Sequence, residues 1–296
     1  MKWLIPAKTF FLGEYVATLG KSAFILTTSP CFELSLVAKP GLNGIDPNSP
    51  AGKFWLECNH KNAGLVFSDP YQGIGGLGAS SAQFLGAYFA HNYLKEKKVE
   101  VKELLDSYLH FAWNGKGVRP SGYDLLAQSM QEVVYIANHG TISHQFNWPF
   151  KEVAFLLIHT GNKLATHHHL QSLELTNNLD KLGDLVDLAK KAFEEQDAKL
   201  IIKAVNQYHQ ELMLMNLVAE QSLKIISTFK EDPNILAVKG CGAMGADVIL
   251  LLVEPKKLRV IQPKLAQFGF NILATSANLC IGNGLIQNKF KKRLEI

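Results

Sequence analysis

A glycine-rich stretch, GIGGLGASSA at residues 73–82, constrains this chain more than any other part of its sequence. Glycine tolerates positive φ, so the backbone can bend until successive N–H groups point into one concavity. The apolar run at residues 83–90 predicts a helix, whose first turn adds free N–H groups and the positive end of a dipole. The stretch is therefore suited to hold an anion such as a phosphate chain.

Three interpretations of this stretch compete. Gly73, Gly75 and Gly78 match the G-x-G-x-x-G spacing of dinucleotide-binding proteins, but that motif needs a strand running directly into its first glycine. Residues 68–72 separate the preceding apolar run from Gly73, which disfavours this interpretation. A Walker P-loop is excluded because no G-K-[ST] follows. A kinase phosphate loop without a Walker lysine and a plain flexible loop both remain open.

Length and composition limit the class of protein. The chain has 296 residues, enough for one large domain or two lobes with a sizeable core. Its 47% hydrophobic and 19% charged residues are typical of a globular protein. The net charge of +4 favours small anionic ligands but is too low to indicate nucleic-acid binding. No apolar run reaches about 18 residues, so we expect no membrane span.

The four cysteines and the N-terminus bear on the compartment. The cysteines are scattered and form no C-x-x-C pair; they are Cys31, Cys58, Cys241 and Cys280. We interpret them as reduced thiols of a cytoplasmic protein and expect neither structural disulfides nor a zinc site. The N-terminal apolar run is broken by Pro6, too early for a signal peptide.

The first half of the chain predicts strands followed by helices. Alternating or β-rich patterns predict strands at residues 3–5, 9–15, 23–28, 32–37, 54–58, 64–67 and 133–137. Gly, Pro and Asn predict a loop at residues 40–53. Apolar periodicity predicts helices at residues 81–97 and 101–112 and a helical start at 123–128.

The second half predicts a different order of elements. We place a lobe boundary near residue 150, which divides the chain into residues 1–150 and 151–296. Strands are predicted at residues 153–159, 248–253 and near 271–273, with helices at about 170–230 and from 256, and residues 235–238 lead into a second glycine-rich loop. Strand, helices, strand, helix and strand in this order favour an α+β fold.

Three separated stretches together resemble one superfamily. PAKTFFLGEY at residues 6–15 is similar to an opening motif P-G-K-x-x-L-x-G-E-[YH], and GLGASSA at 76–82 to a phosphate loop G-L-G-S-S-[AG]. KGCGAMGAD at 239–247 resembles a third, glycine-rich motif. These are motifs of the GHMP kinases, which include galactokinase, homoserine kinase, mevalonate kinase and phosphomevalonate kinase. The resemblance covers residues 6–253 and implies a ribosomal-S5-like N-terminal lobe, a ferredoxin-like C-terminal lobe, and ATP and Mg²⁺ as cofactors.

The sequence departs from these motifs at four positions. Ala79 replaces the first serine of the phosphate loop, and Ala7 replaces a glycine of the opening motif. Met244 and Ala246 interrupt the third loop, where glycines are usual. The third loop is therefore the motif that departs most from the pattern of the superfamily.

PSGYD at residues 120–124 resembles the P-S-G-x-D element of the mevalonate branch. The resemblance implies that Asp124 takes the proton of the substrate hydroxyl, with Lys8 beside it to hold the carboxylate ionised. Without that resemblance, Asp124 reads as a helix N-cap and Lys8 as a solvated surface charge.

The same resemblance implies the remaining site residues. Nucleotide phosphates would contact Gly76, Leu77, Gly78, Ala79, Ser80 and Ser81, with Ser80 also a ligand of Mg²⁺. Substrate would contact Glu14, Tyr15, Lys116, Arg119, Ser121, Gly122, Lys239 and Gly242.

Some residues bear on which member of the branch the chain resembles. Mevalonate kinases carry a Mg²⁺-binding glutamate at the position of Trp113, which cannot bind a metal ion. Asn114-Gly115-Lys116-Gly117 resembles the Q-G-K stretch of phosphomevalonate kinases, and Asp247 matches the end of their G-G-G-D motif. We therefore favour phosphomevalonate as substrate, although the short chain favours mevalonate.

Other features leave this choice unchanged. Thr160-Gly161 with Thr166 resembles a T-G-x-x-x-x-T stretch found in both kinases, and the opening motif disfavours the decarboxylase of the same pathway.

Residues 167–169 are three histidines, which we interpret as a polar helix start without a metal, because adjacent helical residues point apart. A non-catalytic ligand-binding protein of the same fold remains an alternative. The expected partner is a small molecule, with no nucleic acid or membrane, and a homodimer is compatible with the sequence.

Overall fold

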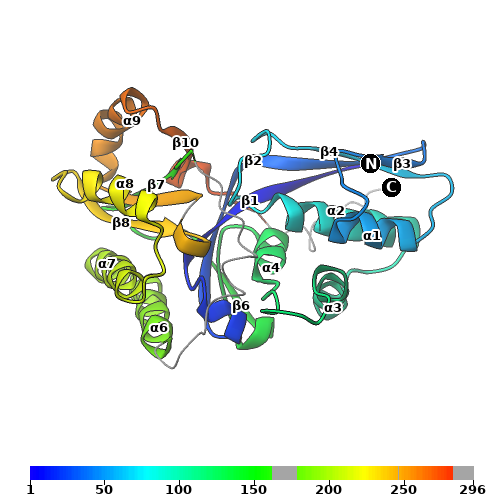
Figure 1. Ribbon diagram of the computed structural model, residues 1–296, viewed down its shortest axis with the longest axis horizontal. Helices are drawn as coiled ribbons and strands as arrows, with labels where there is room; N and C mark the ends of the chain where they lie inside the picture. Colours follow the sequence, from blue (N-terminus) through cyan, green and yellow to red (C-terminus); the bar gives the residue numbers. More distant parts are fainter. Residues whose placement is uncertain (162–178, 246, 283–296) are drawn as a thin grey trace.

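The computed structural model describes residues 1–161, 179–245 and 247–282. These residues form a mixed α+β molecule with two β-sheets at opposite ends (Figure 1). No helix within the described residues is both long and apolar enough to span a bilayer.

The first sheet is built around one long strand. Its strands are β1 (Lys2–Leu12), β2 (Ala23–Val37), β3 (Gly41–Asn43), β4 (Gly64–Ser68), β5 (Val133–Ala137) and β6 (Ile142–Phe146). β2 pairs with β1 along one edge, and with β5 and β4 along successive parts of the other edge. β3 and β6 complete the sheet beyond β4 and β5.

The two predicted strands at residues 23–28 and 32–37 are parts of this single strand β2. Pro30 between them cannot donate a ladder hydrogen bond, a property that in sequence marks a strand end. In the structure the pairing with β1 shifts register there, between Ile5 and Ala7, and the bulge accommodates the proline. The strand β6 was not predicted, and most of its side chains are exposed.

The strand predicted at residues 54–58 is wrong, because this segment belongs to helix α1 (Pro50–Glu57). The Ser49 side chain accepts a hydrogen bond from the Gly52 N–H, and Pro50 occupies the first turn, where its missing N–H does no harm. Phe54 and Trp55 are then buried on one face of the helix. The N-cap signal outweighs the β-rich composition of the segment.

Helices cover one face of the first sheet (Figure 1). They are α1, α2 (Ala79–Leu94), α3 (Val101–Ala112) and α4 (Tyr123–Met130). α2 and α4 pack on β1 and β2, and α3 packs on α1, α2 and α4. The three helices predicted after the glycine-rich stretch are confirmed, and the first of them begins two residues earlier than expected.

The second sheet has the strand order β10-β7-β9-β8, with every neighbouring pair antiparallel. Its strands are β7 (Ala154–His159), β8 (Ile235–Cys241), β9 (Val248–Val253) and β10 (Asn271–Thr275). Numbered within this half, the order is 4-1-3-2 with helices after the first and third strands. This is the ferredoxin-like arrangement that the resemblance implied.

Within residues 179–245 and 247–282, the α-helices are α6 (Asp180–Glu195), α7 (Ala198–Leu214), α8 (Glu220–Lys230) and α9 (Leu258–Gln267). The apolar stripe predicted for the first of them is buried as expected and consists of Leu182, Leu185, Val186 and Ala189. The part of the predicted helical region at residues 170–178 lies outside the described residues, as do Thr166 and the histidines at 167–169.

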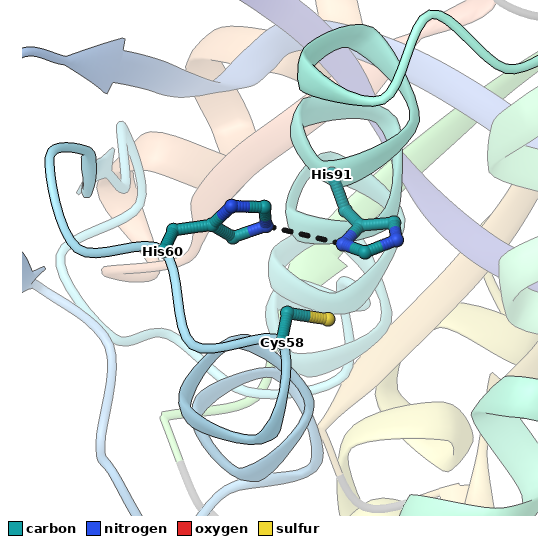
Figure 2. A group of neighbouring side chains, drawn as sticks. All are labelled: Cys58, His60 and His91. Atoms are coloured by element: carbon teal, nitrogen blue, oxygen red, sulfur yellow. Dashed lines mark hydrogen bonds between the residues drawn. The ribbon is translucent and has the colours of Figure 1, made fainter.

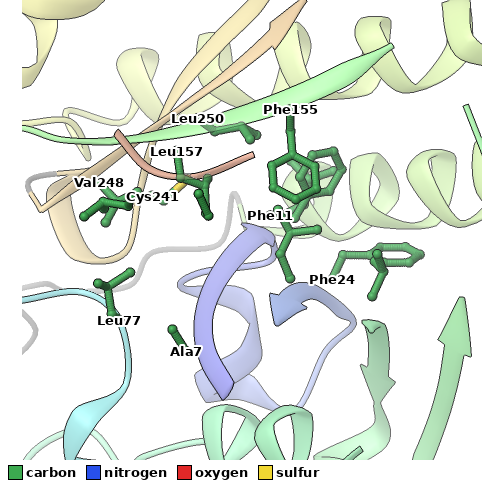
Figure 3. Packing of buried hydrophobic residues seen from close by; sticks show 14 of the residues in the cluster. Ala7, Phe11, Phe24, Leu77, Phe155, Leu157, Cys241, Val248 and Leu250 are labelled. Carbon is green, nitrogen blue, oxygen red and sulfur yellow. The ribbon is translucent and has the colours of Figure 1, made fainter. Parts of the chain in front are cut away.

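One apolar core joins the two sheets. Phe11 of β1 and Phe24 of β2 face Phe155 of β7 (Figure 3). The Phe193 ring of α6 stacks on Phe24 with centroids 4.8 Å apart and meets the edge of Phe11 at 6.3 Å. Aromatic packing of this kind fixes the two halves of the chain against each other.

The last strand of the first sheet ends at Phe146, and the first strand of the second sheet begins at Ala154. The predicted boundary near residue 150 lies between them. The division into residues 1–150 and 151–296 as separate lobes stays a prediction, because the core is continuous across it.

Candidate active site

The glycine-rich stretch forms a bent loop that leads into α2. Gly73, Gly76 and Gly78 all have φ between +82° and +84°. Gly78 is the N-cap of α2 and supplies no capping side chain, and no acidic residue lies in the first turn. The helix therefore presents uncapped N–H groups to an incoming anion.

The two serines of this loop have different environments. Ser80 is exposed in the first turn of α2, which leaves its hydroxyl accessible. Ser81 is buried, and its hydroxyl donates a hydrogen bond to the Gly78 carbonyl at 3.0 Å. The structure therefore leaves the hydroxyl of Ser80 better placed to contact a ligand.

Strand β1 lies directly against the loop. The Lys8 N–H donates to the Leu77 carbonyl at 2.9 Å. A Cβ built on Gly78 would lie 2.7 Å from the Lys8 Cγ, closer than side chains tolerate. Gly78 is thus required both by its positive φ and by the close approach of Lys8.

Lys8 reaches from β1 to α4. Its Nζ lies 3.0 Å from the Asp124 Oδ2, and the two side chains are 10% and 32% exposed. Gly122 is the N-cap of α4, and the Ser121 hydroxyl accepts a hydrogen bond from the Tyr123 N–H at 3.2 Å. Asp124 is therefore in the first turn of the helix, and its carboxylate faces the lysine.

Gln128 joins these parts, and sequence analysis missed it. Its amide nitrogen donates to the Pro6 carbonyl at 2.8 Å and to the Gly78 carbonyl at 3.1 Å. The side chain is fully buried. Gln128 follows Asp124 by four residues, so both lie on one face of α4. That spacing is the only signal in the sequence that points to Gln128.

Asp247 lies beside the phosphate loop. A Cβ built on Gly75 would be 3.3 Å from the Asp247 Oδ1, and one on Gly76 would be 2.8 Å from the Asp247 Cβ. The Asp247 carbonyl accepts a hydrogen bond from the Thr160 N–H at 3.1 Å. The end of the third glycine-rich motif therefore lies next to the phosphate loop, where it places the Asp247 carboxylate.

Glu14 and Lys239 form a buried ion pair with 2.5 Å between the Lys239 Nζ and the Glu14 Oε1. The lysine side chain is 0% exposed and the glutamate side chain 4%. Burial raises the pKa of Glu14, and the lysine opposes that rise. The Lys239 ammonium also lies 5.6 Å from the Tyr208 ring centroid. The structure therefore directs Lys239 into the core between the two halves.

Tyr15 holds the third glycine-rich loop. Its hydroxyl accepts a hydrogen bond from the Met244 N–H at 2.7 Å and donates to the Leu217 carbonyl at 3.3 Å. Gly242 in this loop has a φ of +80°. Tyr15 is only 4% exposed, so it contacts the loop backbone rather than open solvent.

Lys116 and Arg119 lie in the loop between α3 and α4. Both are exposed, and the Arg119 guanidinium is 6.0 Å from the Trp113 ring centroid. The Trp113 indole N–H donates to the Lys116 carbonyl at 3.0 Å and so shapes the loop. Of the three cations considered for a substrate phosphate, these two are accessible and Lys239 is buried.

A cavity of about 500 Å³ adjoins the phosphate loop. It is lined by Pro30, Pro70, Tyr71, Gln72, Ile74, Asn271, Ile272 and Leu273. Ile74 lies within the loop, whereas residues 271–273 come from β10 of the second sheet. The cavity is therefore shared by the two halves of the molecule and has the size of a small-ligand site.

No protein-family model matches the sequence, and no curated protein matches it. Solved structures do resemble this one. A phosphomevalonate kinase from Streptococcus pneumoniae has a TM-score of 0.79 at 17% identity, over 93% of this chain and 98% of that one. The same kinase, solved with phosphomevalonate and AMPPNP, gives a TM-score of 0.78 at 16% identity, over 93% and 99% of the two chains.

Structures of kinases named for other substrates are similar to this one as well. A mevalonate kinase from Methanococcus jannaschii has a TM-score of 0.73 at 16% identity, over 95% of this chain and 98% of that one. A galactokinase from Lactococcus lactis, solved with galactose, has a TM-score of 0.72 at 12% identity, over 96% and 94%. The resemblance stated from the three motifs is confirmed at the level of the fold: this chain has the two-sheet α+β fold of the GHMP kinase superfamily.

Proposed function

We propose that this protein is an ATP-dependent kinase that transfers the γ-phosphate to the hydroxyl of a small molecule. The observation that carries the proposal is the 3.0 Å pair of Lys8 and Asp124 directly beside the phosphate loop. A phosphate cradle alone would only bind a nucleotide. A carboxylate and an ammonium at its edge add the groups that a phosphoryl transfer to an alcohol needs.

In the proposed reaction, Asp124 accepts the proton of the substrate hydroxyl. The hydroxyl oxygen then bonds to the γ-phosphorus, the bond from that phosphorus to the β-bridging oxygen breaks, and ADP leaves. The Lys8 ammonium, 3.0 Å from that carboxylate, stabilises negative charge on the attacking oxygen. The loop N–H groups and the start of α2 hold the phosphates in line, so that catalysis comes mainly from positioning and electrostatics.

Mg²⁺ binds oxygen ligands, and the described residues offer three near the loop. The Ser80 hydroxyl is exposed on the first turn of α2, Asp247 lies beside Gly75, and the Asp124 side chain is partly exposed. This donor set suits a hard divalent cation, which would neutralise charge on the nucleotide phosphates. We propose Ser80 as its protein contact.

The cavity next to Ile74 is the proposed place for the nucleoside part of ATP. It adjoins the phosphate loop, and its proline, tyrosine, isoleucine and leucine side chains give an apolar wall for a base. Its volume of about 500 Å³ is in the usual range for ligand sites.

Phosphomevalonate is the proposed substrate. Lys116 and Arg119 stand exposed in the loop before Asp124, where they are available to a second phosphate group. Trp113 at the position of the mevalonate kinase glutamate supports the same choice. Mevalonate is the second candidate, because a mevalonate kinase structure is also similar to this one. Ser121, Gly122 and Gly242 remain proposed substrate contacts. Glu14, Tyr15 and Lys239 are buried, and for them we propose a supporting role next to the site.

ADP release, coupled to a visible readout, tests the proposal with mevalonate, phosphomevalonate, homoserine and galactose as acceptors. We expect release with phosphomevalonate above that with the other three. Nucleotide binding with no ADP release for any acceptor would instead support a ligand-binding protein of the same fold.

A further inference from the structure

A group of metal-binding side chains lies outside the site described above. Cys58 ends α1, His60 follows in the next turn, and His91 is in the last turn of α2. The sulfur and one nitrogen of each ring all lie within 4.8 Å of one another. Figure 2 shows the two ring nitrogens facing each other and the sulfur beside them. Within the described residues, this is the one group of three such ligands.

The local sequence brings these residues together. Asn59 has a φ of +50°, a left-handed conformation that asparagine tolerates, and it ends α1 and turns the chain. His60 then lies against the Trp55 ring, with centroids 4.4 Å apart. The His91 ring packs on Phe54 at 5.6 Å. Both imidazoles are therefore held by aromatic residues of α1.

We propose that Cys58, His60 and His91 form a binding site for one Zn²⁺ ion. Thiolate and imidazole are the ligands that zinc prefers, and three protein ligands leave a fourth position for water. The His60 Nε2 and His91 Nδ1 atoms are 3.1 Å apart. In a tetrahedral site with Zn–N bonds of about 2.0–2.1 Å, two nitrogens lie about 3.3 Å apart, so the rings need almost no movement.

The sulfur needs a larger adjustment. Tetrahedral geometry places a Zn-bound sulfur about 3.6 Å from each nitrogen, so a Cys58 sulfur at the 4.8 Å limit would move by about 1 Å. Cys58 is the C-cap of α1 and only partly buried, and rotation of its side chain supplies this movement. On binding, the Cys58 S–H proton passes to water and a Zn–S bond forms. The proton shared in the hydrogen bond between the two rings moves, through water, to the other nitrogen of its own ring, and both facing nitrogens then form Zn–N bonds.

Glu57 and Lys95 are the charged neighbours that act on Cys58. Burial, and then Glu57, raise the pKa of the Cys58 thiol to about 11, so the thiol carries its proton in the metal-free protein and Zn²⁺ has to displace it. Burial lowers the pKa of both His60 and His91. The support for the site is therefore the geometry of its three ligand atoms.

The proposed zinc site connects the C-terminal end of α1 to the last turn of α2. His91 follows Ser80 by eleven residues, which at 1.5 Å per residue is about 17 Å along the helix. Zinc would thus stabilise the far end of the helix that starts at the phosphate loop, without contacting the reacting groups. The scattered cysteines, which form no C-x-x-C pair, had predicted no zinc site.

Cobalt titration of the metal-free protein tests the site. We expect one equivalent of Co²⁺ to give tetrahedral d–d bands and a thiolate-to-cobalt charge-transfer band, both removed by Zn²⁺. Cys58→Ser should abolish the charge-transfer band, and His60→Ala and His91→Ala should each weaken Zn²⁺ binding at least about tenfold. Cys31→Ser and His110→Ala are the matched controls, and they should behave like the unchanged protein.

Thermal unfolding provides a second readout that does not depend on activity. Zn²⁺ should raise the Tm of the unchanged protein and leave that of Cys58→Ser unmoved. Cobalt bound without a charge-transfer band would place the metal at other residues, such as the histidines at 167–169, and would overturn the proposal. An equal charge-transfer band in Cys58→Ser would overturn it as well.

Discussion

The Lys8 ammonium and the Asp124 carboxylate lie 3.0 Å apart although they come from the first strand and the fourth helix of the chain. Three further hydrogen bonds fix that distance. The Lys8 N–H bonds the phosphate loop at Leu77, and Gln128, one turn after Asp124, bonds both β1 and the loop. A cation, a carboxylate and a phosphate cradle are therefore positioned as one unit.

Replacement of the carboxylate by an amide should stop catalysis and leave binding intact. Asp124→Asn removes the proton acceptor, and we expect turnover to fall by about 10²–10⁴-fold. Nucleotide affinity, measured by calorimetry, should stay within about twofold. Asp106→Asn, in the exposed part of α3, is the control and should keep full activity. Near-normal turnover of Asp124→Asn would refute the role of this residue.

Two glycines of the loop allow a matched comparison. Gly73 and Gly78 both have positive φ, so alanine strains the backbone at either position. A Cβ at Gly73 meets nothing within 4 Å, whereas one at Gly78 would press on Lys8. We expect kcat/KM to fall at least about tenfold further in Gly78→Ala than in Gly73→Ala, because Lys8 is displaced. Equal losses in steady-state kinetics would show that only backbone strain matters.

The exposed cations before α4 should separate the two candidate substrates. Lys116→Ala and Arg119→Ala remove charge that would meet a substrate phosphate, so each should raise KM for phosphomevalonate about tenfold or more. The KM for mevalonate, which carries no phosphate, should change little. Lys102→Ala in α3 controls for the loss of a surface charge. Unchanged KM values for phosphomevalonate would argue against this loop as the phosphate contact.

The buried pair of Glu14 and Lys239 should behave as a unit in stability. Lys239→Met leaves Glu14 buried without its partner, which costs about 3–5 kcal/mol of unfolding free energy. The double variant Glu14→Gln/Lys239→Met should lose about 0.5–3 kcal/mol less than the sum of the single variants. Urea unfolding measures all three. Additive losses would mean that the two side chains do not interact.

His209 should make stability depend on pH. It is 5% exposed, and burial, with help from Lys239 and Lys230, lowers its pKa to about 4. The unfolded chain, with a histidine pKa of about 6.5, binds this proton more readily. The stabilising contribution is therefore fully present above about pH 6.5 and is lost as pH falls towards 4.

The matching variant is His209→Phe, since neither ring nitrogen has a hydrogen-bond partner among the described residues. Unfolding free energies at pH 7.5 and pH 5 should differ by about 2 kcal/mol less in this variant than in the unchanged protein, at about 1.4 kcal/mol per pKa unit. Identical pH dependence in both proteins would contradict the prediction.

Local signals in the sequence determined much of the fold and part of the site. The glycines within residues 73–78 predicted a bent loop, because few other residue types adopt positive φ. The structure has that loop at the start of α2. The apolar residues of segment 101–112 predicted α3. An α-helix makes one turn per 3.6 residues, so apolar residues that recur at this period lie on one face. Lys8 and Asp124 were predicted from short motifs. These motifs indicate the chemical role of each residue but not the distance between the two side chains.

Tertiary structure alone decided which polar residues meet and which are buried. Lys239 was expected to contact substrate, but the packing of β8 against β1 encloses it with Glu14. The contacts of Gln128 depend on how α4 packs. The approach of Cys58 to His91 depends on how α2 packs. No local sequence pattern encodes either arrangement. Sequence periodicity reports which face of an element is apolar, whereas the approach of two distant side chains follows from the packing of whole elements.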